Sequence, residues 1–160
     1  MNVILCGFTC AGKTTLGREI AKQLAIPFID TDDLLGDVRS LYREIGDQAF
    51  REREREVIFS LRDVKNSLIA IGGGSLILEE NRSFLKGLGQ IVYLKTAYQT
   101  LCPRLEKREW PAFFQEKSMA EMARLRLPVY EQVADFVIDT ELHSSKQIIA
   151  KIIMFANIRG

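Results

Sequence analysis

The sequence predicts an α/β fold in which helices cover both faces of a five-stranded parallel sheet, a three-layer α-β-α arrangement. Five short apolar segments alternate along the chain with amphipathic segments, and no repeat or Pro/Gly/Ser-rich linker interrupts them. Strands that are apolar along their whole length are typical of parallel sheets buried on both faces. The length of 160 residues corresponds to one domain, which we expect to span residues 1–160.

Each predicted strand is a short apolar run that ends at a glycine or a polar residue. The five runs are Val3–Cys6, Pro27–Ile29, Leu68–Ile71, Gln90–Leu94 and Phe136–Ile138. The helices are predicted where apolar residues recur on one face of a helix with 3.6 residues per turn. This spacing is found in Lys13–Leu24, in the segment Phe50–Leu61 and in the C-terminal segment Ile148–Ala156.

A further helix is predicted from Met119, because Ser118 and Glu121 have the spacing of an N-terminal capping box. We expect Pro128 to disturb this helix, since the residue before a proline avoids helical backbone angles. The preceding segment, about residues 106–118, contains several aromatic residues and follows neither the helical nor the strand period. It is a candidate lid over a ligand site, and the alternative is a surface loop whose aromatic side chains pack against the protein.

Composition and charge argue against several classes of protein. Lys and Arg number 22 and Asp and Glu 21, so the net charge of +1 is too small for a protein held to nucleic acid by charge alone. Three cysteines without metal-ligand spacing indicate reduced thiols and a cytoplasmic location. Apolar runs of membrane-spanning length and a basic N-terminal leader are both missing. We therefore expect neither a membrane nor a nucleic-acid partner.

A phosphate-binding motif lies between the first predicted strand and the first predicted helix. Residues Gly7–Thr14 match GxxxxGK[ST], a P-loop whose backbone N–H groups and following helix N-terminus bind phosphate oxygens. We expect Lys13 to act as a catalytic charge on the β- and γ-phosphates of ATP, and Thr14 to offer its hydroxyl to Mg²⁺. The alternative is a glycine turn followed by an accidental Lys-Thr pair. The residues expected to bind the nucleotide here are Gly7, Thr9, Cys10, Ala11, Gly12, Lys13, Thr14 and Thr15.

Candidate acceptor-binding residues follow the second and third predicted strands. Asp30 and Asp32 come at the end of the second strand, where ligands of open parallel sheets bind. Because the third strand lacks a following aspartate, Asp30 is the nearest carboxylate for Mg²⁺, although one carboxylate of Asp30–Asp33 could instead cap the next helix. The three glycines Gly72–Gly74 allow a ligand to approach the backbone closely, and a tight turn is the alternative.

Two arginines are candidates for a binding role. Guanidinium groups bind carboxylates and phosphates through two parallel hydrogen bonds, which draws attention to Arg51 and Arg126. The alternating run Arg51–Glu56, however, is typical of an exposed helix face with i,i+3 pairs, for example between Glu52 and Arg55. From the charge pattern alone, Arg51 is therefore predicted to lie on the surface.

Taken together, these motifs resemble the shikimate kinase family over nearly the whole chain. The P-loop is common to many families, whereas the combination of the other runs is more selective. The matching runs are Gly7–Thr14, Phe28–Asp32, Gly46–Glu54, Gly72–Gly74 and Arg126–Ala134. The resemblance implies transfer of the γ-phosphate of ATP to the 3-hydroxyl of shikimate in aromatic amino-acid biosynthesis, and a sheet of strand order 2-3-1-4-5 with a mobile lid. The expected partners are ATP or ADP, Mg²⁺ and shikimate, bound by a monomer.

The resemblance also implies roles for individual residues. Asp30 would serve the Mg²⁺ side together with Thr14, and Asp32 would contact the shikimate hydroxyls as the catalytic base. Arg51 and Arg126 would bind the shikimate carboxylate, which replaces the surface interpretation of Arg51. The residues expected at shikimate are Asp32, Arg51, Gly72, Gly73, Gly74 and Arg126.

The predicted lid departs from the family pattern. Family lids usually read Arg-Pro-Leu-Leu, with the arginine on the transferring phosphate, whereas Trp110 stands at that position here. We expect Arg108 to supply this charge as a catalytic and nucleotide-binding residue, with Arg104 as the second choice. Two rival functions stay open at this point. One is a P-loop kinase for another small hydroxylated acid or a nucleotide, and the other is a nucleotide-binding module without transfer activity.

Overall fold

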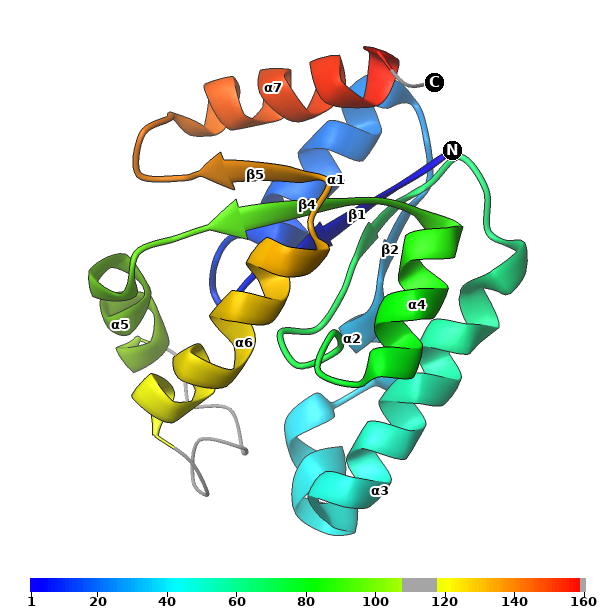
Figure 1. The fold of residues 1–160 in the computed structure, drawn as a ribbon, viewed down its shortest axis with the longest axis vertical. Coiled ribbons are helices and arrows are strands. Elements are labelled where there is room, and N and C mark those ends of the chain that lie inside the picture. Colours follow the sequence, from blue (N-terminus) through cyan, green and yellow to red (C-terminus); the bar gives the residue numbers. More distant parts are fainter. Residues whose placement is uncertain (108–117, 159–160) are drawn as a thin grey trace.

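The computed structural model describes residues 1–107 and 118–158, and within them the chain forms a five-stranded sheet between two layers of helices (Figure 1). Neighbouring strands are all parallel, and the strand order is β2-β3-β1-β4-β5. The predicted three-layer fold and the strand order implied by the family resemblance are confirmed. The strands are β1 (Asn2–Cys6), β2 (Phe28–Asp30), β3 (Leu68–Ala70), β4 (Gly89–Lys95) and β5 (Phe136–Asp139).

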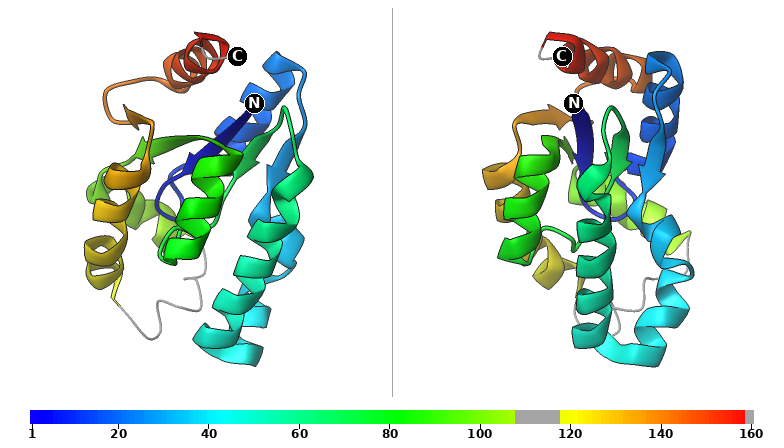
Figure 2. Two further views of the ribbon diagram at one scale, coloured as in Figure 1. Left: turned by 45° about the vertical axis from the view of Figure 1, so that its right-hand side comes forward. Right: turned by 90° about the vertical axis from the view of Figure 1, so that its right-hand side faces the viewer.

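Helices lie on both faces of the sheet (Figures 1 and 2). Helices α1 (Lys13–Leu24) and α7 (Ser145–Ile158) contact each other on one face. The other face is covered by α4 (Glu79–Leu88) and α6 (Met119–Val133), with α3 (Val38–Ser60) beside α4. This distribution is the one that right-handed crossovers produce for the observed strand order. The remaining described helices are α2 (Thr31–Leu35), the 3₁₀ helix η1 (Leu61–Asp63) and α5 (Tyr98–Glu106).

The burial of β1 agrees with its central position in the sheet. All residues of β1 are buried, and Ile4 and Leu5 expose 0% of their surface. The edge strand β2 is only half-buried along its length. Because β1 runs directly into the P-loop, its central position places that loop in the middle of the carboxyl edge of the sheet.

Helix α6 begins at the predicted capping box. The Ser118 hydroxyl accepts a hydrogen bond from the backbone N–H of Glu121, and the Glu121 carboxylate accepts one from the backbone N–H of Ser118. The prediction that Pro128 disturbs this helix is wrong, because α6 is continuous to Val133. Buried residues on both sides of the proline, among them Arg126 and Tyr130, pack the helix into the protein, and this packing outweighs the local cost of proline.

The long helix α3 has a break that the sequence pattern does not predict. Its backbone leaves helical angles at Gly46, where φ is 80° and ψ is 175°. The turn at this glycine lets Tyr42 from the first part of α3 pack edge-on against Phe50 from the second part, with ring centroids 5.3 Å apart. These two rings form the centre of a small apolar cluster that is separate from the main core.

Candidate active site

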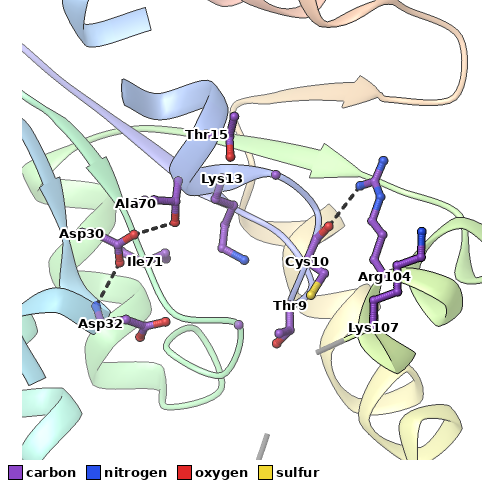
Figure 3. A pocket seen from close by; sticks show the side chains of 13 residues that line it. Thr9, Cys10, Lys13, Thr15, Asp30, Asp32, Ala70, Ile71, Arg104 and Lys107 are labelled. Carbon is purple, nitrogen blue, oxygen red and sulfur yellow. Dashed lines mark hydrogen bonds between the residues drawn. The ribbon is translucent and has the colours of Figure 1, made fainter. Parts of the chain in front are cut away.

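Two adjoining cavities open at the carboxyl ends of the strands. The larger one, the P-loop cavity, has a volume of about 470 Å³, and the smaller one, the arginine cavity, about 200 Å³. The P-loop cavity (Figure 3) is lined by Thr9, Cys10, Gly12, Lys13, Thr14, Thr15, Asp30, Asp32, Ala70, Ile71, Gly73, Arg104 and Lys107. The arginine cavity is lined by Thr9, Asp32, Val38, Arg39, Tyr42, Phe50, Arg51, Glu54, Gly72, Gly73, Gly74 and Arg126. Thr9, Asp32 and Gly73 therefore belong to both cavities.

The backbone of the P-loop explains its glycines. Gly7 and Gly12 have φ values of +152° and +97°, which residues with a side chain rarely adopt. A Cβ atom at Gly7 would also lie 2.9 Å from the carbonyl oxygen of Leu94. Gly12 caps α1 without a side-chain hydrogen bond, so the first N–H groups of this helix are not capped by a side chain of the loop. Such a helix start, at the edge of a cavity, is suited to bind an anion.

Lys13 projects into the P-loop cavity (Figure 3). Its Nζ atom donates hydrogen bonds to the carbonyl oxygens of Gly7 (2.7 Å) and Phe8 (3.0 Å). Burial lowers the pKa of Lys13, while the nearby carboxylates, Asp32 first and then Asp30, act in the opposite direction. The ammonium group of Lys13 thus lies against the loop that would surround a phosphate.

Asp30 caps the next helix and also lines the P-loop cavity. Its Oδ2 accepts a hydrogen bond from the Thr14 hydroxyl at 2.7 Å, at the wall of the P-loop cavity. Its Oδ1 accepts a hydrogen bond from the backbone N–H of Asp32 at 3.0 Å and thereby caps α2. The cap orients the carboxylate, and the hydroxyl and carboxylate oxygens of this pair are the type of ligand that Mg²⁺ prefers.

Asp32 lies where the two cavities meet. The side chain keeps contact with solvent in the open cleft, but the surrounding protein lowers the hydration of the carboxylate. This burial, together with the negative charge of Asp30, raises the pKa of Asp32 to about 6, and the positive charge of Lys13 partly offsets the rise. A carboxylate with this pKa can accept a proton from a bound hydroxyl near neutral pH.

The two predicted arginines come together in the arginine cavity, from helices far apart in the sequence. Nη1 of Arg51 donates to Oε1 of the buried Glu54 at 2.9 Å, and the Arg51 side chain is 17% exposed. Arg126 is 2% exposed and forms a hydrogen bond with the hydroxyl of Tyr130. Burial first, and then the positive charge of Arg51, lower the pKa of Arg126. The prediction from the charge pattern that Arg51 lies on the surface is wrong.

The same run of charges shows why the surface interpretation failed. Of its six residues only Arg51 and Glu54 turn inward, whereas the others are exposed. Arg53 pairs with Glu56, as an i,i+3 pair on an exposed face should. Arg55 pairs with Glu80 on α4 and not with Glu52. An alternating charge pattern cannot distinguish the buried pair from the exposed ones.

None of the three glycines has a positive φ, so the backbone conformation does not require glycine here. The glycines instead leave space for neighbouring side chains. A Cβ atom at Gly73 would lie 3.0 Å from Nη1 of Arg126, and one at Gly74 would lie 2.4 Å from Nη1 of Arg51. Both arginines therefore approach the loop backbone closely. The groups that approach the loop in this structure are side chains of the protein itself, and the approach of a ligand stays a prediction.

Sequence reasoning gave no role to three residues that the structure places around this loop. Glu54 holds Arg51, and Ser75 donates a hydrogen bond to Glu54. The hydroxyl of Tyr130 donates to the carbonyl oxygen of Gly73. Glu54 and Tyr130 lie in the runs that carry the family resemblance, three and four residues after Arg51 and Arg126, and this helical spacing was the available signal.

The predicted nucleotide residues are placed as follows. Those that line the P-loop cavity are Thr9, Cys10, Gly12, Lys13, Thr14, Thr15 and Arg104. Gly7 and Ala11 are buried in the loop behind them. Arg104 donates from Nη1 to the carbonyl oxygen of Cys10 at 3.0 Å and so lies at the P-loop, as Figure 3 shows. Arg108, Trp110 and most of the predicted lid, 106–118, lie outside the described residues.

Comparison with known proteins agrees with this arrangement. The family model of shikimate kinase matches residues 9–157. "Shikimate kinase 1" of Hamiltonella defensa is 35% identical over 95% of this chain and 94% of its own length. A solved shikimate kinase from Acinetobacter baumannii, in complex with shikimate, superposes with a TM-score of 0.80 at 29% identity and covers 99% of this chain and 93% of its own. The enzyme from Bacteroides thetaiotaomicron gives a TM-score of 0.83 at 28% identity, over 98% of both chains. With the P-loop, the paired arginines and the glycine loop in place, the chain belongs to the shikimate kinase family.

Proposed function

We propose that this chain transfers the γ-phosphate of ATP to the 3-hydroxyl of shikimate, with ATP in the P-loop cavity and shikimate in the arginine cavity. Membership of the family makes the chain an ATP-dependent kinase. The observation that supports the assignment of the two cavities is the position of Asp32, which lines both. A hydroxyl bound on one side of it would face a phosphate bound on the other.

The proposed reaction is a direct phosphoryl transfer. The 3-hydroxyl oxygen forms a bond to the γ-phosphorus, and the bond from that phosphorus to the bridging oxygen of ADP breaks. Asp32 accepts the hydroxyl proton, and a pKa of about 6 keeps most of its carboxylate ready to do so at pH 7. Lys13 and the N-terminus of α1 stabilise the negative charge on the phosphate oxygens.

We propose Thr14 and Asp30 as the protein ligands of Mg²⁺. Their side chains meet at 2.7 Å on the wall of the P-loop cavity and offer only oxygen atoms. Mg²⁺ usually takes one or two carboxylate or hydroxyl ligands from a protein and completes its shell with water and substrate phosphates, so this pair fits. Bound there, Mg²⁺ would neutralise part of the phosphate charge.

Arg51 and Arg126 are the proposed ligands of the shikimate carboxylate. Two guanidinium groups line a cavity of about 200 Å³, close enough for the charge of Arg51 to lower the pKa of Arg126. An anion bound between them would relieve this repulsion and could accept hydrogen bonds from both. Gly72, Gly73 and Gly74 complete the same wall, on the loop that both arginines approach.

The remaining expectations rest on the sequence and stay proposals. We propose a monomer with one domain over residues 1–160, a lid over 106–118, Arg108 as the lid charge and a cytoplasmic location. The cysteines Cys6, Cys10 and Cys102 are free thiols, which is consistent with that location. In the described parts of the chain, the helices are too short or too polar to cross a membrane.

A coupled assay of ADP release across a panel of acceptors tests the proposed function. The panel contains shikimate, its methyl ester, another hydroxylated acid of similar size and a nucleoside monophosphate. We expect turnover with shikimate, at least about tenfold weaker apparent affinity for the ester because it lacks the charge that the arginines bind, and none with the nucleotide. Equal turnover of shikimate and its ester would contradict the arginine assignment. Turnover of the nucleotide alone, or no transfer at all, would favour one of the two rival functions.

A further inference from the structure

Ser75 follows the three glycines and makes a hydrogen bond that none of the proposed roles uses. Its side chain is fully buried and lines neither cavity. Its Oγ donates to Oε2 of Glu54 at 2.9 Å. The other oxygen of this carboxylate, Oε1, accepts from Nη1 of Arg51, also at 2.9 Å. Glu54 is therefore shared between a buried hydroxyl and an arginine of the proposed acceptor site.

The hydroxyl of Ser75 has a fixed position, because the loop that carries it forms hydrogen bonds with three helices. The carbonyl oxygen of Ser75 accepts from Nδ2 of the buried Asn81 on α4 at 2.9 Å. At the start of the loop, the backbone N–H of Gly72 donates to Oγ1 of Thr31 on α2 at 3.2 Å. Between these two contacts, the hydroxyl of Tyr130 on α6 donates a hydrogen bond to the carbonyl oxygen of Gly73. Ser75 thus offers Glu54, on α3, a rigid partner.

Arg51 also has a second carboxylate close by. Oδ1 of Asp47, one helical turn earlier, lies 3.7 Å from Nε of Arg51. The side chain of Asp47 is 57% exposed, whereas that of Glu54 is 3% exposed. A carboxylate as buried as Glu54 needs hydrogen-bond partners for both oxygens, and Ser75 provides the second one. Without that hydroxyl, Glu54 would reorient and Arg51 would shift toward the solvated Asp47.

We infer that Ser75 is a positioning residue for the acceptor: its hydroxyl orients the Glu54 carboxylate, which in turn holds the Arg51 guanidinium against Gly74 in the arginine cavity. The inference rests on the proposed function, since it takes the arginine cavity to be the shikimate site. It assigns to Ser75 no contact with any substrate. The expected signature is therefore a change in apparent shikimate affinity that is transmitted through Glu54.

The test compares Ser75→Ala with Ser67→Ala. Ser67 is a matched control because it is also buried and its hydroxyl also makes one hydrogen bond, to the carbonyl oxygen of Lys65, at the other end of β3. We expect Ser75→Ala to raise KM for shikimate about five- to tenfold, as the loss of a charge-assisted hydrogen bond would. KM for ATP and Tm should change no more than they do in the control.

Two double variants show whether Ser75 acts through Glu54. In a Glu54→Gln background, Ser75→Ala should raise KM for shikimate by less than about twofold, because the carboxylate that it orients is gone. Adding Asp47→Asn to Ser75→Ala should lower KM again, since the competing carboxylate is removed. If Ser75→Ala fails to fold, Ser75→Cys keeps the volume with a weaker donor and should give a smaller rise in the same direction.

The outcomes separate this inference from the proposed function. An active wild type in which Ser75→Ala matches the control, raises both KM values equally, or adds fully to Glu54→Gln would overturn the inference alone. A wild type that turns over another acceptor and not shikimate overturns the proposed function and the inference with it.

Discussion

The P-loop cavity and the arginine cavity are neighbours, but they are built in different ways. The P-loop cavity takes more than a third of its lining from one contiguous segment, Thr9–Thr15, in which Cys10 and Gly12 have positive φ angles. The arginine cavity is assembled from separate segments between residues 9 and 126. Buried hydrogen bonds between segments, such as that of Ser75 in the glycine loop with Glu54 on α3, connect them. The comparison teaches that the first site is a local feature of the chain and the second is a product of tertiary packing.

The largest effect is expected at the centre of the P-loop cavity. Lys13→Ala should lower kcat by at least about 10³-fold, because it removes the ammonium group that stabilises charge on the transferring phosphate. The fold should persist, since the hydrogen bonds of Lys13 to the described residues go to carbonyl oxygens of the loop. Steady-state kinetics measure kcat, and circular dichroism checks that the variant is folded. Near-normal turnover in a folded variant would contradict the P-loop assignment.

Substitution of Asp32, which lines both cavities, should have the next largest effect on kcat. Asp32→Asn should lower kcat by about 10²-fold or more and weaken shikimate binding, while ATP binding measured by calorimetry stays intact. The base must be deprotonated to work, and the pKa of Asp32 is raised to about 6. Wild-type kcat should therefore fall as pH drops below 6 and level off above 7, whereas the variant should lose this dependence. Loss of ATP affinity with shikimate affinity retained would reverse the assignment.

The next variant concerns Arg108, which we propose as the positive charge that the lid supplies. Arg108→Ala should lower kcat by at least about tenfold, the smaller end of the cost of a lost transition-state contact. The companion variant is Arg104→Ala, which removes the hydrogen bond of Arg104 to the carbonyl oxygen of Cys10. Kinetics of the two variants side by side decide between them. Wild-type kcat in both would mean that neither arginine supplies charge to the reaction.

In the arginine cavity the effect should fall on affinity. Arg51→Lys and Arg126→Lys should each raise KM for shikimate about tenfold, since an ammonium group cannot replace a guanidinium that binds a carboxylate with two hydrogen bonds. KM for ATP should change much less. Arg53→Lys is the control from the same run of charges, because Arg53 is exposed and pairs with Glu56 on the same helix. Equal rises for both substrates would indicate a structural role for the two arginines.

The smallest effect tests the fit between the glycine loop and Arg51. Gly74→Ala places a Cβ atom 2.4 Å from Nη1 of Arg51, so the flexible end of that side chain must move. We expect KM for shikimate to rise about threefold, below the cost of losing a hydrogen bond altogether, with little change in Tm. Gly87→Ala on α4, where a Cβ atom would meet nothing within 4 Å, is the control. A large loss of Tm in Gly74→Ala alone would indicate that the loop cannot accept a side chain for structural reasons.

Local features of this protein could be predicted from the sequence. The strands are predicted to within one residue at each end, because each is a short apolar run. The P-loop is predicted with its strand and helix, since its geometry depends on residues that are adjacent along the chain. The capping box at Ser118 is confirmed for the same reason. The strand order came only through the family resemblance.

Tertiary structure decided what the local sequence pattern could not, namely which of several similar residues face inward. Arg51 and Arg53 look alike in an alternating run of charges, yet one lines a cavity and the other is exposed, because only Arg51 lies on the side of α3 that faces the glycine loop. Pro128 is tolerated within α6 because of what the helix packs against. Ser75 acquires a partner 21 positions earlier in the chain. Burial and long-range hydrogen bonding depend on which segments meet in the folded chain, and no local period encodes that meeting.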